Sequence, residues 1–270
     1  MSSDFSRSIT GHEYTCIQIT QPKEGLKIIT LNRPECLNAI SLAEAEDLEI
    51  AFQELKFDSK TRVVILTGAG RGFCAGLDLK EVSERPPIGT RVRSSWDLQK
   101  HMANIIELMR VCPQPIIAAV NGAAAGGGAS FVMASDIRLC VPKTKFILSF
   151  VNIGLSAADM GSSFMLPRLI GVARAAEIMY TGRTVMGEEG VQLGIFSRCV
   201  EPEQLMDVAM EYADCLLGKS ELGLIGTKEA INATMEGTSL YTQLNLENRT
   251  QFICSTAGSF KESTNKFASK

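Results

Sequence analysis

The chain has 270 residues, a net charge of −3, and 45% hydrophobic and 21% charged residues. This composition is typical of a globular protein and excludes a disordered chain. The scattered Lys and Arg residues give neither a nucleic-acid footprint nor a polybasic membrane surface. The length suits one large domain, or a core with an appendage.

The N-terminal part of the chain predicts a hairpin and then a helix. YTCIQIT (14–20) and LKIITLN (26–32) are β-rich runs separated by the turn signal PKEG. The segment SLAEAEDLEIAFQELK (41–56) has apolar residues at helical spacing. Its Ser41 and Glu44 fit a capping box, so we expect the helix to begin just after Ser41.

Two short apolar runs predict buried strands that each end in a glycine-rich loop. RVVILTG (62–68) leads into GAGRGFCAG, and PIIAAVN (115–121) leads into GAAAGGG. Between them, a polar region with Pro86 and Pro87 predicts a loop, and a helical pattern follows over 94–110.

The rest of the chain is predicted to be mostly helical. After a short helix, DIRLC and KTKFILS have strand patterns, and helical segments then run from Ser162 to about Cys254, interrupted by one strand, FSRCV. Buried runs that alternate with helices favour an α/β class with parallel pairing. We place a boundary near residue 200, between an α/β core (1–200) and a C-terminal helical region (201–270).

The eight cysteines do not form a disulfide framework in this interpretation. They are spread along the chain without a C-x-x-C pair, several lie in apolar runs, and there are only two histidines. A Cys/His metal site is therefore not expected. The first ten residues have no apolar stretch like that of a secretory signal. We expect an intracellular, reduced, cytoplasmic protein.

The uncharged stretch 111–135 is long enough to cross a membrane, but its composition argues against this. Pro, Gln, Asn and a Gly/Ala cluster make it weakly hydrophobic, and its glycine run would break a helix. A buried strand, a loop and a helix explain it better, and no membrane partner is expected.

Nucleotide-binding and triad motifs are absent or weak. GAGRGF resembles a dinucleotide fingerprint, but its third glycine is displaced and no suitable acidic residue ends a following strand. There is no G-x-x-x-x-G-K-[ST] and no G-x-S-x-G. His101 lies in the middle of a predicted helix, so a Ser–His–Asp triad is not expected.

The loops FCAGLDL (73–79) and AAAGGGAS (123–130) are the candidates for a functional site. Glycine allows a backbone to approach a ligand closely. If a helix begins just after Gly127, its first N–H groups have no intrahelical partner. Two such N–H groups could converge on one oxygen as an oxyanion hole. Tight turns and close helix–strand packing explain the same glycines, and spacing alone leaves both interpretations open.

Longer motifs carry a resemblance. LNRPECLNAIS, GRGFCAGLDLKEV, PQPIIAAVNGAAAGGG, SDIRLC, LPRLIGVARAAEIMYTGRTV and GIFSRCVEP together resemble the crotonase superfamily, the enoyl-CoA hydratase/isomerase family, over roughly residues 14–256. The resemblance implies a spiral of ββα units, and C-terminal helices that make contacts in a homotrimer or in a hexamer of two trimers. It also implies coenzyme A thioester substrates, with no cofactor beyond the coenzyme A of the substrate.

The resemblance also assigns site residues. The oxyanion donors correspond to the N–H groups of Leu77 and Gly127. The backbone near Ala39, Ala75 and Leu77 corresponds to the wall for pantetheine and adenine. Hydratases of this family carry two glutamates, and the aligned residues here are Ser130 and Phe150, which are expected to line the substrate site. Both hydratase carboxylates are therefore missing, and the reaction subclass stays open.

Asp159 is the carboxylate that could replace them. Dienoyl-CoA isomerases carry a proton-transfer aspartate in this loop, and 4-chlorobenzoyl-CoA dehalogenases carry a nucleophilic one. The loop here is one residue longer than theirs. Asp159 is followed by Met160, Gly161 and Ser162, so it could instead be the cap of a helix that begins there.

We expect isomerase or hydratase-type chemistry with Asp159 as acid/base. The alternatives are hydrolase- or dehalogenase-like covalent catalysis by Asp159, and a non-catalytic CoA-binding protein. The segment 84–93 is expected to shape the acyl end of the pocket.

Overall fold

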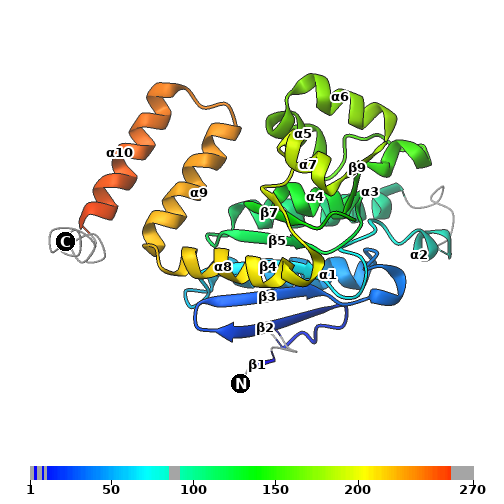
Figure 1. Cartoon of the computed structure of the whole chain (residues 1–270), viewed down its shortest axis with the longest axis horizontal. Helices are drawn as coiled ribbons and strands as arrows, with labels where there is room; N and C mark the ends of the chain where they lie inside the picture. The colour runs from blue at the N-terminus through cyan, green and yellow to red at the C-terminus, as the bar shows by residue number, and fades with distance from the viewer. Residues whose placement is uncertain (1–2, 5–7, 9–10, 85–91, 257–270) are drawn as a thin grey trace.

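The computed structural model describes residues 3–4, 8, 11–84 and 92–256 (Figure 1). The proline-containing loop, and with it most of the segment 84–93, lies outside the described residues. No helix of the described part of the chain is both long and apolar enough to cross a membrane. The uncharged stretch 111–135 instead forms the end of one helix, a buried strand, a short strand and a second helix.

A seven-stranded sheet and a three-stranded sheet organise the chain. In the larger one β2 and β3 form the expected antiparallel hairpin, and β3, β4, β5, β7 and β10 are parallel neighbours in that order. Its strands are β1 (Ser3–Asp4), β2 (Ile17–Lys23), β3 (Leu26–Leu31), β4 (Val63–Gly68), β5 (Ile116–Val120), β7 (Ile137–Cys140) and β10 (Arg198–Cys199). The smaller sheet contains β6 (Ala124–Ala125), β8 (Lys145–Ile147) and β9 (Thr184–Met186).

Helices follow the strands and then dominate the C-terminal part. The α-helices are α1 (Leu42–Phe57), α2 (Leu79–Glu84), α3 (Val92–Val111), α4 (Gly127–Ala134), α5 (Ser162–Ile170), α6 (Val172–Thr181), α7 (Gly187–Leu193), α8 (Leu205–Leu217), α9 (Glu221–Met235) and α10 (Leu240–Thr256). Short 3-10 helices are η1 (Pro34–Cys36), η3 (Ser149–Ile153) and η4 (Pro202–Gln204).

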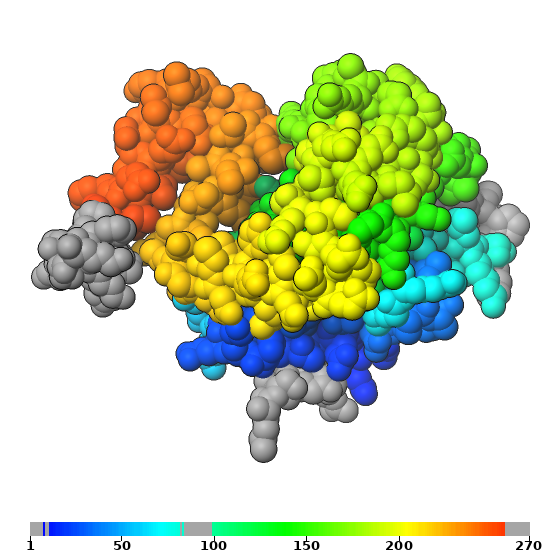
Figure 2. All heavy atoms as spheres, viewed as in Figure 1, coloured from blue at the N-terminus to red at the C-terminus, as the bar shows by residue number. Residues whose placement is uncertain are grey.

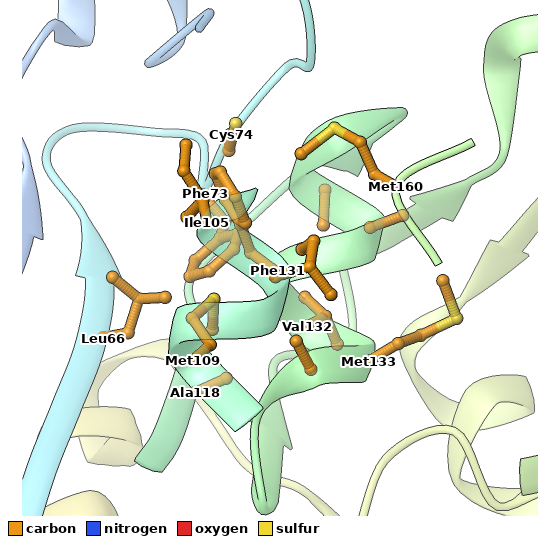
Figure 3. Packing of buried hydrophobic residues seen from close by; sticks show 14 of the residues in the cluster. Leu66, Phe73, Cys74, Ile105, Met109, Ala118, Phe131, Val132, Met133 and Met160 are labelled. Atoms are coloured by element: carbon orange, nitrogen blue, oxygen red, sulfur yellow. The ribbon is translucent and has the colours of Figure 1, made fainter. Parts of the chain in front are cut away.

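The central strands are buried on both faces, which is why they read as continuous apolar runs. Side chains of a strand point alternately to opposite faces. Val64 and Leu66 of β4 join one core with α1, α3 and α4, whereas Val63 and Ile65 join a second core with α8. Figure 3 shows the first core, in which Leu66 lies near aromatic and aliphatic side chains of the glycine loops and helices.

Most predicted elements are confirmed, but β1 and α2 were not predicted, and further details differ. Ser41 Oγ accepts the Glu44 N–H at 3.1 Å, as a helix cap should. The Glu44 carboxylate does not return a hydrogen bond of good geometry, and the Ser41 backbone lowers its pKa only weakly. The capping box is therefore only half formed. The short strands β6 and β9 were not predicted, because each has three residues or fewer and forms in a small sheet built from distant segments.

The last two helices lie beside the body rather than on the sheet (Figures 1 and 2). Helix α8 packs on the sheet, but α9 and α10 mainly contact each other. Polar contacts hold α9 to the body. The buried Lys228 Nζ lies 3.0 Å from Asp136 Oδ2 and donates to the carbonyls of Met109 and Gln114. Asn232 also donates to the Arg110 carbonyl at 2.9 Å. The division at residue 200 stays a prediction, with α8 belonging to the second core.

Candidate active site

The two glycine loops meet where β4 and β5 end. Gly76 has φ +86° and Gly126 has φ +51°. A Cβ placed on Gly76 would lie 2.7 Å from the Ala125 carbonyl oxygen and 3.4 Å from the Gly126 Cα. A larger residue at position 76 would push the loops apart, so glycine is needed for the approach of the two backbones as well as for the positive φ.

Two backbone N–H groups of these loops have no acceptor among the described residues. Ile40 donates to the Gly76 carbonyl and accepts from Asp78, so the Leu77 N–H between them points away from this pairing. Gly127 is the first residue of α4, where a helix leaves its N–H without an intrahelical partner. Both predicted oxyanion donors are therefore free to bind a ligand.

These loops line a cavity of about 140 Å³. It collects five of the predicted site residues: Ala75, Leu77, Gly127, Phe150 and Asp159. Asp159 is the one titratable side chain in the described lining. The remaining lining residues are Ile40, Leu79, Gln99, Met102, Gly126, Ser149, Ile153, Leu155 and Met160.

The structure does not place the other two predicted residues in the lining. Ala39 is buried, and its carbonyl accepts a hydrogen bond from the Arg33 guanidinium at 2.5 Å. Ser130 lies on α4 and is fully buried, with an Oγ that has no hydrogen-bond partner in the described structure. Neither residue supplies a carboxylate, and Phe150, buried on η3, lines the cavity with an aromatic ring.

Asp159 faces this cavity from a strained turn. Met160 has φ +44° and Gly161 has φ +78°, and a non-glycine residue in this region is uncommon. The half-buried Asp159 carboxylate accepts the Met160 N–H at 2.7 Å and the side-chain amide of Gln99, both on Oδ1. Helix α5 begins at Ser162 after Gly161 and has no side-chain cap. The helix-cap interpretation of Asp159 is therefore not supported.

A charged cluster lies behind the first glycine loop. Arg33 Nη2 lies 3.0 Å from Asp78 Oδ2, so it ties the residue after Leu77 to the start of the hairpin's exit loop. Glu44 is fully buried, 3.9 Å from the Arg33 guanidinium. Burial raises the pKa of Glu44 to about 8 against the opposing attraction of Arg33, with added repulsion from Asp47 and Asp78. Near neutral pH the Glu44 carboxyl is therefore mostly protonated, and Arg33 forms its ion pair with Asp78.

Sequence reasoning missed Gln99 and Arg33. Gln99 is an exposed glutamine on α3, a position that helical periodicity does not distinguish from a solvated surface. Arg33 lies in the matched motif LNRPECLNAIS, but its contacts are made across 45 residues of chain and have no local signal.

A larger cavity, of about 580 Å³, lies between α9 and α10. Its lining contains neither glycine loop and no residue predicted to act in the site. Size alone does not select the site. The smaller cavity is the candidate because it combines unpaired backbone donors with a carboxylate.

Comparison with known proteins shows the fold and the family of this chain. A crystal structure of an enoyl-CoA hydratase from Bacillus anthracis matches with a TM-score of 0.88 and 30% identity, over 94% of this chain and 96% of that chain. The protein thus has the crotonase fold. The family model described as enoyl-CoA hydratase/isomerase matches residues 21–270. The chain belongs to the enoyl-CoA hydratase/isomerase family and is an enzyme of that family.

Relatives within the family carry different activities in their names. A probable enoyl-CoA hydratase of Mycobacterium bovis is 36% identical over 249 residues, covering 91% of this chain and 87% of the relative. A 1,2-epoxyphenylacetyl-CoA isomerase of Escherichia coli is 32% identical over 252 residues, covering 93% of this chain and 95% of the relative. The family is therefore certain, and the reaction subclass has to be argued from the site.

Proposed function

We propose that the protein is an isomerase of acyl-CoA thioesters. The N–H groups of Leu77 and Gly127 hold the thioester oxygen, and Asp159 moves a proton between two carbons of the acyl chain. One observation carries the proposal: a single carboxylate shares a cavity with two unpaired backbone donors.

The donors stabilise the charge that the reaction develops. The reaction removes a proton from the carbon beside the thioester carbonyl, or from a carbon conjugated with that carbonyl. The product is an enolate whose negative charge lies largely on the thioester oxygen. Preorganised N–H groups lower the energy of such an oxyanion, and loss of one donor typically costs ~10²–10³ in rate. The bond between Arg33 and Asp78 steadies the loop that presents the Leu77 N–H.

The number of acid–base groups favours isomerisation over hydration. Isomerisation needs one group, which takes a proton from one carbon and returns it to another, so that no atom is gained or lost. Hydration also needs a group that activates water. The described lining offers Asp159 alone, because Phe150 and Ser130 stand where a hydratase has glutamates. The relatives include a named isomerase and a probable hydratase, so this choice depends on the site and not on their names.

The cavity also supports an acyl substrate bound by its thioester end. At about 140 Å³ it has room for the thioester and the first carbons but not for coenzyme A. Leu79, Ile153 and Leu155 line it and are 52%, 49% and 51% exposed, an apolar rim that fits an acyl chain. Pantetheine would run along the backbone near Ala39 and Ala75, and coenzyme A enters as part of the substrate.

The C-terminal helices fit the predicted trimer. They expose several large apolar side chains, which is typical of a surface that another subunit covers. We propose a homotrimer, or a hexamer of two trimers, built through α9 and α10. The exposed side chains are Leu222, Ile231, Leu240, Tyr241, Leu244, Phe252 and Ile253.

A thioester panel tests the proposed reaction. Enoyl-, 3-enoyl-, dienoyl- and aryl-CoA thioesters are incubated with the wild type, Asp159→Asn and the control Asp207→Asn, whose side chain is exposed on α8. Mass spectrometry follows products and intact protein. The proposal expects an isomer of unchanged mass from the wild type and the control, and strongly reduced turnover in Asp159→Asn. An acyl adduct on Asp159 would instead establish covalent catalysis, and no turnover of any thioester would support a CoA-binding protein.

A further inference from the structure

Both hydrogen bonds to the Asp159 carboxylate reach the same oxygen. Oδ1 accepts the Met160 N–H and the Gln99 amide, whereas Oδ2 has no partner among the described residues. The two oxygens of this carboxylate are therefore not equivalent. An oxygen that already accepts two donors is a poor place for a proton, and the unpaired oxygen is available to a substrate carbon.

The two donors come from different parts of the fold. The Met160 N–H belongs to the turn that carries Asp159 itself, so it follows any movement of this turn. Gln99 lies 60 residues earlier, on α3, and its side chain lines the same cavity. Helix α3 packs against α1 and α4, the helix that begins with Gly127. Gln99 thus connects the carboxylate to the scaffold that also holds an oxyanion donor.

We propose that Gln99 is the positioning residue of the proton-transfer step: its amide holds Oδ1 and leaves Oδ2 to carry the proton. This inference rests on the proposed function. A carboxylate held at one oxygen by the local turn alone can still rotate, and the second donor restricts that rotation. An amide does this without adding a formal charge, so Asp159 can both take up and release a proton during one turnover.

Kinetics of three variants tests the inference with 3-hexenoyl-CoA as the probe. Gln99→Leu removes the donor, and Gln99→Glu keeps the shape but replaces the amide with a second carboxyl group. Lys100→Leu is the control, because Lys100 is exposed on the same helix and outside this cavity. We expect kcat to fall about 10–100-fold in both Gln99 variants, as misplacement of a reacting group does. KM should change less than kcat, because the Gln99 amide is bonded to the Asp159 carboxylate.

A double variant shows whether Gln99 acts through Asp159. If it does, Gln99→Leu combined with Asp159→Asn is no slower than Asp159→Asn alone. Multiplied losses would overturn the inference, as would unchanged kcat in both Gln99 variants while Asp159→Asn is impaired. If the wild type isomerises no thioester of the panel, or if Asp159→Asn is as active as the wild type, the proposed function itself fails. Circular dichroism of each variant confirms that it is folded.

Discussion

The buried Glu44 makes the stability of this protein depend on pH. Its side chain is fully buried without a hydrogen bond of good geometry from the described residues, and burial raises its pKa from 4.5 to about 8. The nearby Arg33 opposes this rise, and Asp47 and Asp78 add to it. The unfolded chain releases the proton of Glu44 near its ordinary pKa, whereas the folded protein keeps it to about pH 8. The folded state therefore binds more protons between these two values, and stability falls as the pH rises through this window.

The size of the effect follows from the two pKa values. Each tenfold change in proton affinity corresponds to about 1.4 kcal/mol. Between pH 5.5 and 8.5 the Glu44 carboxyl lowers the free energy of unfolding by about 3 kcal/mol. Glu44→Gln has the same shape and no titration, so it removes this part of the pH dependence and gains stability relative to the wild type as the pH rises.

Urea denaturation at fixed protein concentration measures this. The free energy of unfolding is determined for the wild type, Glu44→Gln and the control Glu46→Gln, which lies exposed on the same helix. The difference between Glu44→Gln and the wild type should grow by about 3 kcal/mol from pH 5.5 to 8.5 in favour of the variant, and the control should follow the wild type. A difference that does not change with pH would refute the reasoning.

Three further changes probe the loop, the polar contacts of α9 and the assembly. Gly76→Ala places a Cβ 2.7 Å from the Ala125 carbonyl at φ +86°, so kcat on 3-hexenoyl-CoA should fall ~10²-fold with the fold retained by circular dichroism; wild-type activity would contradict this geometry. Lys228→Met removes the buried donor to the Met109 and Gln114 carbonyls, while Asp136 keeps its ion pair with Arg110. It should cost ~1–3 kcal/mol of unfolding free energy in urea, and no measurable loss would contradict the anchoring role of Lys228. Phe252→Asp should convert the proposed trimer to monomer in light scattering, and an unchanged mass would exclude this face from the interface.

The parallel part of the fold could be predicted because it depends on local pattern. The apolar runs that became β4 and β5 are fully buried on both faces, and each ends in a loop whose glycines adopt positive φ or allow close approach. The same glycines led to the N–H groups of Leu77 and Gly127. These features depend on residue types within one short segment, which a sequence displays directly.

What could not be predicted depends on contacts between distant segments. The hydrogen bond from Gln99 to Asp159 joins α3 to a turn 60 residues later, and no periodicity marks it. Glu44 matched a capping box, but helix α1 turns its carboxylate into the protein interior, where the reciprocal bond is absent. Whether Asp159 caps a helix or faces the cavity depends on where α5 begins, which the local sequence does not determine.

Turnover in deuterated water tests the central claim, that Asp159 moves the proton of an enolate reaction. The wild type and Asp159→Asn are incubated with 3-hexenoyl-CoA in D₂O, and the product and intact protein are analysed by mass spectrometry. The account predicts an isomerised product without an acyl adduct on the protein, and a loss of turnover of ~10²–10⁴ in Asp159→Asn. Deuterium enters the product to the extent that the proton on Asp159 exchanges with solvent before it is returned. Wild-type turnover by Asp159→Asn, or an adduct on Asp159 in the wild type, would contradict the account.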